Sequence, residues 1–170
     1  MKAKPVSASA LDNQVHGLTP KDFNSSWTMS GGVVTALLDE KAGAVVRRHS
    51  GMNCVTLSFD NIRFKKPVSC GLLIFNAAIN RVWDTSCEVG VKVFVEYPGA
   101  DLREHIASAY CTFVTGEMII EKVELNGVAI QQPRFLPKPM PKVVPCTKEQ
   151  RRRWREANER RAKRLAAAKN

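Results

Sequence analysis

Asn24-Ser-Ser-Trp-Thr-Met-Ser-Gly-Gly32-Val-Val-Thr-Ala-Leu-Leu-Asp39-Glu-Lys-Ala-Gly-Ala-Val-Val-Arg-Arg-His49 is the stretch that decides the fold. Its second half carries apolar residues at the i, i+3, i+4 spacing of one broad helical face. These residues are Val34, Leu37, Leu38, Ala42, Val45 and Val46. No other part of the sequence is both long enough and apolar enough for a central, largely buried helix. We therefore expect one long helix here, covered by the rest of the chain.

Asp39 is a carboxylate inside this otherwise apolar run. A buried charge is costly unless it is paired or used, so Asp39 is either a functional residue or a residue at the solvent edge beside Glu40 and Lys41. This stretch alone leaves both interpretations open. The Gly31–Gly32 pair at the entrance of the helix lets the backbone approach a ligand or another chain closely.

The composition is that of one domain with a proper core and some additional chain. The chain has 170 residues, of which 44% are hydrophobic, which argues against wholesale disorder. Its five cysteines are odd in number and never form a CxxC pair. This pattern argues against a disulfide framework or a zinc site and favours a reducing compartment. We expect a cytoplasmic protein, with a mitochondrial presequence in residues 1–20 as the alternative.

The positive charge is concentrated at the C-terminus. The chain has a net charge of +10, and residues 147–170 contain ten basic and three acidic side chains, a net charge of +7. The remaining +3 belongs to residues 1–146, so the body is nearly balanced. Basicity is therefore a property of the tail.

The pattern after the helix predicts an antiparallel sheet in an α+β fold. A strand begins near residue 52, with a bulge at Asp60-Asn61, and further strands follow over 71–82, 86–97 and 103–115. The clearest alternation is that of Val89, Val91, Val93 and Val95. We interpret Gly116 as the end of the last main strand, followed by a short run over 118–123. The strands follow one another as hairpins wrapped around the helix.

Four segments are predicted along the chain. Residues 1–14 form an irregular N-terminal arm, residues 15–126 the main domain, residues 127–146 a proline-rich linker, and residues 147–170 a basic helix. Thr147-Lys-Glu-Gln150 is a capping box at the start of that helix. Its apolar stripe is thin, so the helix is expected to dock lightly or to be exposed.

An irregular arm, one central helix and an antiparallel sheet curled around it resemble the hotdog fold. Several motifs resemble the single-hotdog acyl-CoA thioesterases of the cytosolic acyl-CoA hydrolase family. These motifs are Val15-His-Gly-Leu-Thr-Pro20-Lys-Asp22-Phe-Asn24, Gly31-Gly32, Leu38-Asp39-Glu40, Asp60-x-Ile62-x-Phe64-x-x-Pro67 and Thr85-Ser86-x-Glu88. The resemblance extends from about Val15 to Leu165.

The resemblance implies hydrolysis of acyl-CoA thioesters to free fatty acid and coenzyme A, with no metal and no cofactor other than the coenzyme A of the substrate. It also implies a homodimer with a continuous sheet, assembled further as a trimer of dimers, with sites at the pairing interface. Asn24 would orient or polarise the thioester and water, and Asp39 of the partner subunit would be the general base or nucleophile. The Gly32 amide, at the positive end of the helix, would stabilise the oxyanion.

Further residues are assigned to substrate binding by the same resemblance. Ser86 lies where the family often contacts ligand, and Gly31 lies at the entrance of the helix. Charge-assisted contacts to the phosphates of coenzyme A would come from basic side chains. The candidates are Arg63, Lys65, Arg160, Arg161 and Arg164.

The chain departs from the family pattern near these sites. Trp27 stands where the family usually has glycine, Ser30 where it usually has an apolar aromatic residue, and Trp83-Asp84 where it usually has Gly-Arg. A bulky Trp27 would shorten or block an acyl channel, and Asp84 would repel a phosphate. These departures predict either an altered acyl-chain preference or weak or lost activity.

Two other functions are weighed against hydrolysis. One is a non-catalytic hotdog subunit or scaffold in a larger assembly, with the basic tail contacting RNA or protein. The other is a hotdog dehydratase, which would need a catalytic histidine in the helix region. His49 lies at the far end of the helix and His16 well before its start, so neither is beside Gly31-Gly32, and we discount the dehydratase.

Overall fold

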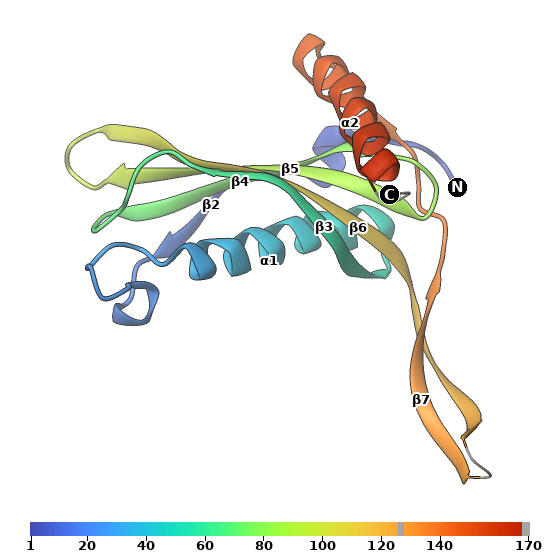
Figure 1. Ribbon diagram of the computed structural model, residues 1–170. Helices are drawn as coiled ribbons and strands as arrows, with labels where there is room; N and C mark the ends of the chain where they lie inside the picture. Colours follow the sequence, from blue (N-terminus) through green and yellow to red (C-terminus); the bar gives the residue numbers. More distant parts are fainter. Residues whose placement is uncertain (126–127, 168–170) are drawn as a thin grey trace.

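The computed structural model describes residues 1–125 and 128–167. A curved antiparallel sheet separates two helices, with α1 on its concave face and α2 on the other (Figure 1). The strand order is β2-β4-β5-β6-β3, and β7 pairs with the distal part of β6. The elements are β1 (Lys4–Pro5), η1 (Val6–Ala8), β2 (Leu11–Gly17), η2 (Pro20–Asp22), α1 (Gly31–Ser50), β3 (Asn53–Phe64), β4 (Leu72–Val82), β5 (Ser86–Tyr97), β6 (Leu102–Leu125), β7 (Val128–Pro137), β8 (Val143–Val144) and α2 (Lys148–Ala167).

The predicted central helix is confirmed as α1, which packs against the concave face of the sheet. Its apolar face is buried with the inward side chains of β5, as the period of each element requires. The buried members are Val34, Leu38, Ala42, Val45, Val46, Val89, Val91, Val93 and Val95. The helix ends at Gly51, whose φ of +73° is the left-handed conformation that glycine adopts without strain. This packing determines where Gly31, at the start of α1, and Asp39, near its middle, lie over the sheet.

The bulge predicted in β3 is also confirmed. The register of β3 against β6 shifts between Asp60 and Arg63, and Asn61 has a φ of +53°. β3 is an end strand of the sheet order. Exposed apolar side chains lie along it at Val55 and Leu57, and Phe64 is exposed at its end. An open edge with apolar side chains is suited to pairing with another chain.

The N-terminal arm is not irregular, which corrects the prediction for residues 1–14. β2 runs antiparallel to β4 from Leu11 to Gly17, so the predicted boundary at residue 15 falls inside a strand. The sequence of β2 gave no alternation because the strand lies at the other edge of the sheet and most of its side chains are exposed. Its backbone hydrogen bonds to β4, rather than an apolar face, hold it in place. β1 pairs in parallel with β8.

Residues 128–137 are paired as a strand rather than forming the first part of the predicted linker. β6 continues through Gly116 to Leu125, and β7 pairs with it over its whole length. A Cβ at Gly116 would lie 2.1 Å from the Leu136 carbonyl oxygen, so glycine permits the close approach of β7 and does not end β6. Pro133 is tolerated because β7 is paired on one side only.

The C-terminal helix begins with the predicted capping box. Thr147 Oγ1 accepts a hydrogen bond from the Gln150 amide at 3.1 Å, and Gln150 Oε1 accepts one from the Thr147 amide at 3.2 Å. α2 lies on the convex face of the sheet, with Ala157 buried against it. Neither α1 nor α2, within the described residues, is long and apolar enough to cross a membrane.

Candidate active site

Asn24 organises the turn that leads into α1. Its Oδ1 accepts hydrogen bonds from the amides of Ser26 at 2.9 Å and Thr28 at 3.2 Å. Its Nδ2 donates to Thr28 Oγ1 at 2.9 Å, and its carbonyl accepts from the Trp27 amide at 3.1 Å. Asn24 itself is exposed. The side chain is therefore held in one orientation by its own turn.

Trp27 occupies a backbone conformation that normally calls for glycine. Its φ is +56°, in the left-handed region, where a residue with a Cβ is destabilised by about 1–2 kcal/mol. Its side chain is 77% exposed. A turn with this backbone favours glycine, and this chain carries a bulky ring there at a conformational cost.

Asp22 ties the Asn24 turn to the start of α1. Its Oδ2 accepts hydrogen bonds from the Thr19 amide at 2.6 Å and the Thr19 hydroxyl at 2.9 Å, and its carbonyl accepts from the Ser30 amide at 2.8 Å. The Thr19 amide is the main reason why the pKa of this carboxyl is lowered. We did not single out Asp22 from the sequence, although Thr19-Pro-Lys-Asp22 has the spacing of a capping box.

A cavity of about 330 Å³ opens beside the N-terminus of α1. Because the first amides of a helix have no intrahelical acceptor, the end at Gly31 and Gly32 can donate hydrogen bonds to an anion. The cavity brings together Gly31 and Lys65, two of the predicted binding residues. Its lining consists of Thr28, Met29, Gly31, Val34, Phe64, Lys65, Lys66, Pro67, Val68 and Ile106. An apolar cavity with a cationic rim can hold an apolar chain attached to an anionic group.

Asp39 lies at the edge of the sheet, half-exposed, where α1 passes β3. Its Oδ1 accepts a hydrogen bond of 2.6 Å from Thr56 Oγ1. The side chain is thus partly exposed and oriented by a hydroxyl, a position that fits both of our interpretations. Thr56 was missed in the sequence because it is seventeen residues away. The feature that could have indicated Thr56 is its position on the side of β3 that faces α1.

One chain does not bring the three catalytic candidates together. Seven residues separate Gly32 from Asp39 along α1, which corresponds to about 10 Å at 1.5 Å per residue. Asn24 precedes the helix, in the turn that leads to its first residue. A thioester carbonyl that accepts a hydrogen bond from the Gly32 amide is therefore out of reach of Asp39 in the same chain.

The other predicted binding residues lie away from the cavity. Ser86 begins β5 opposite Val114, at the end of the sheet where α1 ends. Arg63 is exposed on β3 opposite Ser108 and does not line the cavity. Lys65, by contrast, is at the cavity, with its Nζ donating to His105 Nδ1 at 2.9 Å.

The tail arginines hold α2 on the convex face of the sheet. Arg160 donates to both carboxylate oxygens of the fully buried Glu88, at 2.7 and 2.9 Å, and its guanidinium lies 3.6 Å from the centroid of the Tyr110 ring. Arg164 forms an ion pair with Asp60. These contacts occupy the two side chains on the face opposite α1. Their assignment to the phosphates of coenzyme A stays a prediction, and so does RNA or protein contact by the tail.

Trp83 is explained by the docking of α2. Its indole Nε1 donates to Asn158 Oδ1 at 3.0 Å, and the guanidinium of Arg161 lies 4.5 Å from its ring centroid. Asp84 accepts a hydrogen bond from the Met140 amide through its backbone carbonyl. The departure from the family at Trp83 therefore serves the C-terminal helix.

The histidines named in the dehydratase alternative have structural contacts. His49 is fully buried at the end of α1, within hydrogen-bonding distance of Ser9 Oγ at 3.2 Å and the Pro141 carbonyl at 2.9 Å. His16 lies 3.3 Å from Asp22 Oδ2. Over residues 1–125 and 128–167, no group of three metal-binding side chains comes together.

Comparison with known proteins gives consistent relationships. Residues 28–99 match the family model described as the thioesterase superfamily. Protein VdlD of Helicobacter pylori is 38% identical over 141 residues, covering 82% of this chain and 72% of the relative. The uncharacterized acyl-CoA thioester hydrolase YkhA of Bacillus subtilis is 31% identical over 132 residues, covering 77% of this chain and 68% of the relative.

Solved structures extend the similarity to nearly the whole chain. The acyl-CoA hydrolase of Staphylococcus aureus, solved with butyryl-coenzyme A and coenzyme A, is 26% identical with a TM-score of 0.80, covering 98% of this chain and 94% of that protein. It has also been solved with an asparagine, an aspartate or a threonine replaced by alanine. A hexameric acyl-CoA thioesterase is 28% identical with a TM-score of 0.83, covering 99% and 98% of the two chains.

These relationships and the helix enclosed by a curved sheet define the class. The chain belongs to the hotdog-fold acyl-CoA thioesterases, a family of thioester hydrolases.

Proposed function

We propose that pairs of this chain hydrolyse acyl-CoA thioesters to a free fatty acid and coenzyme A. The observation that carries the proposal is the placement of Asp39, oriented by Thr56 at the open edge of the sheet and about 10 Å from the Gly32 amide of its own chain. A carboxylate and an oxyanion donor that are separated in one chain can act on one carbonyl when two chains meet.

The spacing of the three polar residues supports the assignment. The residues replaced in the Staphylococcus aureus hydrolase are an asparagine, an aspartate fifteen positions later and a threonine seventeen positions after that. Asn24, Asp39 and Thr56 have the same two intervals. Thr56 therefore joins the candidate catalytic group as the residue that positions Asp39.

The pairing expected from the fold joins two β3 edges in antiparallel fashion. A two-fold axis perpendicular to the sheet and beside β3 keeps both α1 helices on one face and runs them in opposite directions. This brings the N-terminus of α1 in one chain toward the middle of α1 in the other. Gly32 of one protomer then approaches Asp39 of its partner. A hexameric relative is consistent with three such pairs in one assembly.

The proposed reaction uses the groups at this junction. The thioester carbonyl oxygen accepts a hydrogen bond from the Gly32 amide, and the helix end stabilises the developing negative charge. Asp39 either removes a proton from the attacking water or attacks the carbonyl carbon itself, and Asn24 orients the thioester and water. Collapse of the tetrahedral intermediate breaks the carbon–sulfur bond. The thiolate of coenzyme A leaves and is protonated. Attack by water gives the fatty acid directly, whereas attack by Asp39 gives a mixed anhydride that a water molecule then hydrolyses to the fatty acid and free Asp39.

The first test is hydrolysis by the purified protein of acyl-CoA substrates from short to long chains, measured by the free thiol released. We expect turnover with at least one chain length. Asp39→Asn is expected to lower kcat by about 10²–10⁴-fold, because the carboxylate is lost while its size is kept. Glu40→Gln, one residue further on the exposed side of α1, is the matched control and should keep wild-type turnover. No hydrolysis at any chain length would defeat the proposal.

Thr56 gives a finer version of the same test. Thr56→Val removes the hydroxyl that bonds Asp39 and is expected to lower kcat about ten-fold, the size of one hydrogen bond to a charged group. Thr56→Ser keeps the hydroxyl and should retain most of the activity. Equal activity in the two variants would remove Thr56 from the candidate group.

A further inference from the structure

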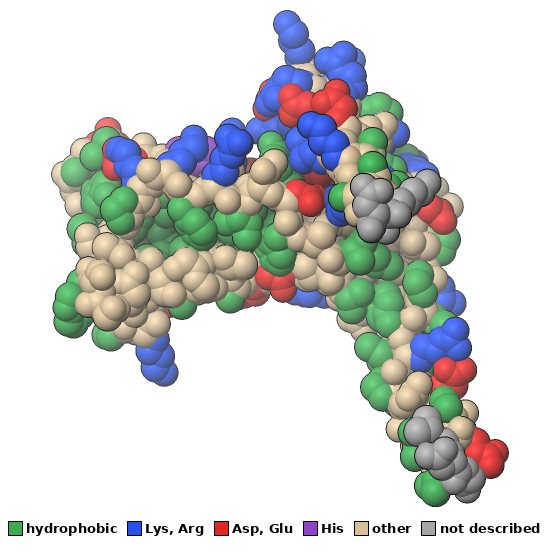
Figure 2. Space-filling model, in the orientation of Figure 1, with side chains coloured by type: hydrophobic (Ala, Val, Ile, Leu, Met, Phe, Trp, Pro, Cys, Tyr) green, Lys and Arg blue, Asp and Glu red, His purple; other side chains and the backbone are tan. Residues whose placement is uncertain are grey.

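The β6–β7 extension forms a distal hairpin that projects from the sheet on the α1 side (Figure 1). We use this name for residues 117–124 of β6 and 128–137 of β7. Large apolar side chains are exposed on it, at Met118 (55%), Ile120 (64%), Val128 (61%) and Ile130 (37%). Hydrophobic side chains follow its length in the space-filling view (Figure 2). A two-stranded ribbon is marginally stable by itself, so this apolar surface is suited to a partner.

The register divides the distal hairpin into two faces. Met118 lies opposite Phe135 and Ile120 opposite Pro133, so these four side chains share one face. We call it the Met118 face. Within β7, Val128 is an odd number of positions from Pro133 and from Phe135, so it belongs to the other face. The Met118 face carries Met118 and Ile120, the exposed large apolar side chains that lie nearest the base of the hairpin.

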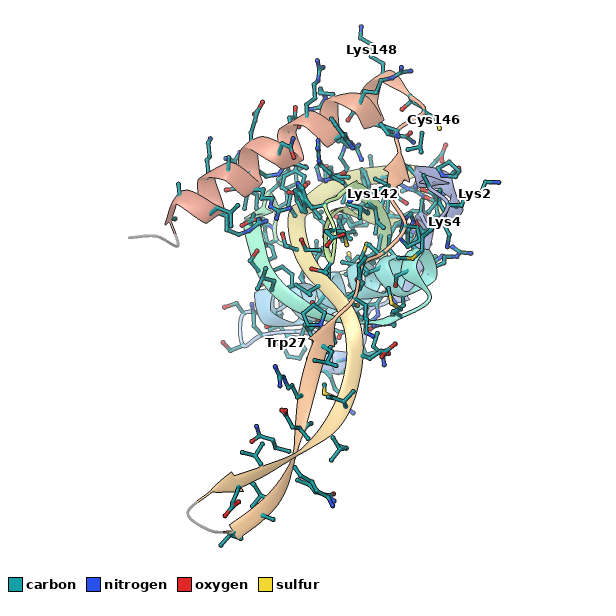
Figure 3. The ribbon with its side chains drawn as sticks, turned by 90° about the vertical axis from the view of Figure 1, so that its right-hand side faces the viewer. Lys2, Lys4, Trp27, Lys142, Cys146 and Lys148 are labelled. Atoms are coloured by element: carbon teal, nitrogen blue, oxygen red, sulfur yellow. The ribbon has the colours of Figure 1, made fainter. Side chains whose placement is uncertain are left out.

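A second exposed apolar group lies at the opposite end of α1. Trp27 is 77% exposed in a turn held by hydrogen bonds that Asn24 donates and accepts, and it adopts a left-handed backbone that a tryptophan rarely takes. Figure 3 places Trp27 on the side of the sheet from which the distal hairpin projects, away from α2. A conformational cost maintained at an exposed ring points to a contact that compensates for it.

Antiparallel pairing at β3 would bring these two groups together. The distal hairpin leaves the sheet where Asn53, the first residue of β3, pairs with Gly116. The last residue of β3, Phe64, lines the cavity beside Gly31, close to the Asn24 turn. In an antiparallel pair the first residues of one β3 lie beside the last residues of the other. The hairpin of each protomer then projects beside the Asn24 turn of its partner.

We propose that the Met118 face of the distal hairpin packs against Trp27 of the partner subunit. The inference rests on the pairing in the proposed function and goes beyond it, because it adds an element contributed in trans that encloses the Asn24 turn. The occupant of this surface is a second copy of the chain. Burial of the ring, Met118 and Ile120 would exclude water from one side of the candidate active site.

Crosslinking tests the contact without reference to activity. In a background with the exposed Cys70 and Cys146 changed to serine, we would compare the double variants Trp27→Cys/Ile120→Cys and Trp27→Cys/Val128→Cys. A short bis-maleimide should join two chains roughly ten-fold faster in the first, since a defined contact raises effective concentration. Val128 is the control because it is about as exposed as Ile120 but lies on the other face, nearer the far end of the hairpin.

Single variants separate this inference from the proposed function. Ile120→Asp should raise KM several-fold and shift tryptophan emission to longer wavelength, while Val128→Asp should change neither. A protein that is monomeric at working concentration would overturn both the pairing and the contact. A dimer that hydrolyses substrate but crosslinks equally through positions 120 and 128 would overturn the contact alone. A dimer that crosslinks selectively without hydrolysis would support the contact and defeat the enzymatic proposal.

Discussion

Local hydrogen bonds orient the polar residues of the candidate site. Thr56 fixes Asp39, Asp22 fixes the approach to α1, and Asn24 is bonded within its own turn. The sequence alone identified Asp39 as an anomaly, because a carboxylate breaks an apolar period. It did not identify Thr56 or Asp22 as partners, because each hydrogen bond depends on where a strand or turn lies relative to α1. The approach to the helix combines an oriented Asn24 with a strained Trp27.

His49 gives a prediction on pH. Burial lowers the pKa of this imidazole below its ordinary value of 6.5, and Lys4, whose Nζ donates to the His49 carbonyl, acts in the same direction. The unfolded chain binds this proton more readily than the folded chain, so protonation of His49 favours unfolding. The stability that neutral His49 contributes is therefore present above about pH 6.5 and is lost as the pH falls toward the folded-state pKa. We expect the free energy of unfolding to decrease over that range.

Urea unfolding at a series of pH values checks this expectation. His49→Gln keeps a polar side chain without a group that titrates in the range, so its free energy of unfolding should fall less steeply below about pH 6.5. The comparison between variant and wild type cancels other groups that titrate, including His105, whose pKa burial also lowers. Parallel profiles for the two proteins would contradict the prediction.

The elements differ in how well their patterns predicted them. α1, the bulge of β3 and the capping box of α2 have strong local signals, and all three are confirmed. β2 and β7 have none, since β2 is an exposed edge strand and β7 contains prolines. The positions of β2 and β7 are determined by hydrogen bonds to backbone N–H and C=O groups of β4 and β6. α2 docks through arginines, a mode that a thin apolar stripe does not predict.

Arg160 is expected to be essential for the docking of α2. It is the ionic partner of Glu88, whose side chain has no exposed surface, and Asn80 donates a further hydrogen bond at 2.9 Å. Arg160→Leu leaves a buried carboxylate without its cation, which typically costs about 3–5 kcal/mol. We predict a loss of this order in the free energy of unfolding, measured with urea.

Two further variants identify the cause. Arg155→Leu removes an exposed arginine from the same helix and should change the stability by less than about 0.5 kcal/mol. Glu88→Gln combined with Arg160→Leu should recover part of the lost stability, because the buried charge is then absent. If the double variant were as unstable as Arg160→Leu, the cost would come from packing and not from the unpaired carboxylate.

At the scale of the whole molecule, the candidate residues of one chain are spread along the length of α1. Gly31, Gly32 and Lys65 lie at one end of α1, Asp39 lies in its middle, and Ser86 lies at the end where α1 ends. The spacing of these residues in the sequence could not show this arrangement, because spacing does not indicate which edge strand of the sheet is available to pair with another chain. The open β3 edge, known only from the sheet order, is the feature that turns separate residues into a shared site.

Mixing two inactive variants tests the shared site directly. Asn24→Ala loses the orienting amide and Asp39→Asn loses the carboxylate, so each homodimer should be nearly inactive. In a mixed pair, Asn24 of the Asp39→Asn chain meets Asp39 of the Asn24→Ala chain, and one of the two sites is intact. Random exchange of equal amounts makes half of the pairs mixed, so about a quarter of wild-type activity should return.

The control for this recovery is a mixture of two chains that both carry Asp39→Asn, one of which also carries Glu40→Gln. This mixture contains no intact site in any pair. Activity should appear only after the subunits exchange, for example on dilution from mild urea followed by removal of the urea. If Asn24 and Asp39 act within one chain, mixing restores nothing, because every chain keeps its own defect. Recovery near a quarter therefore separates a site built across the pair from a site built in one protomer.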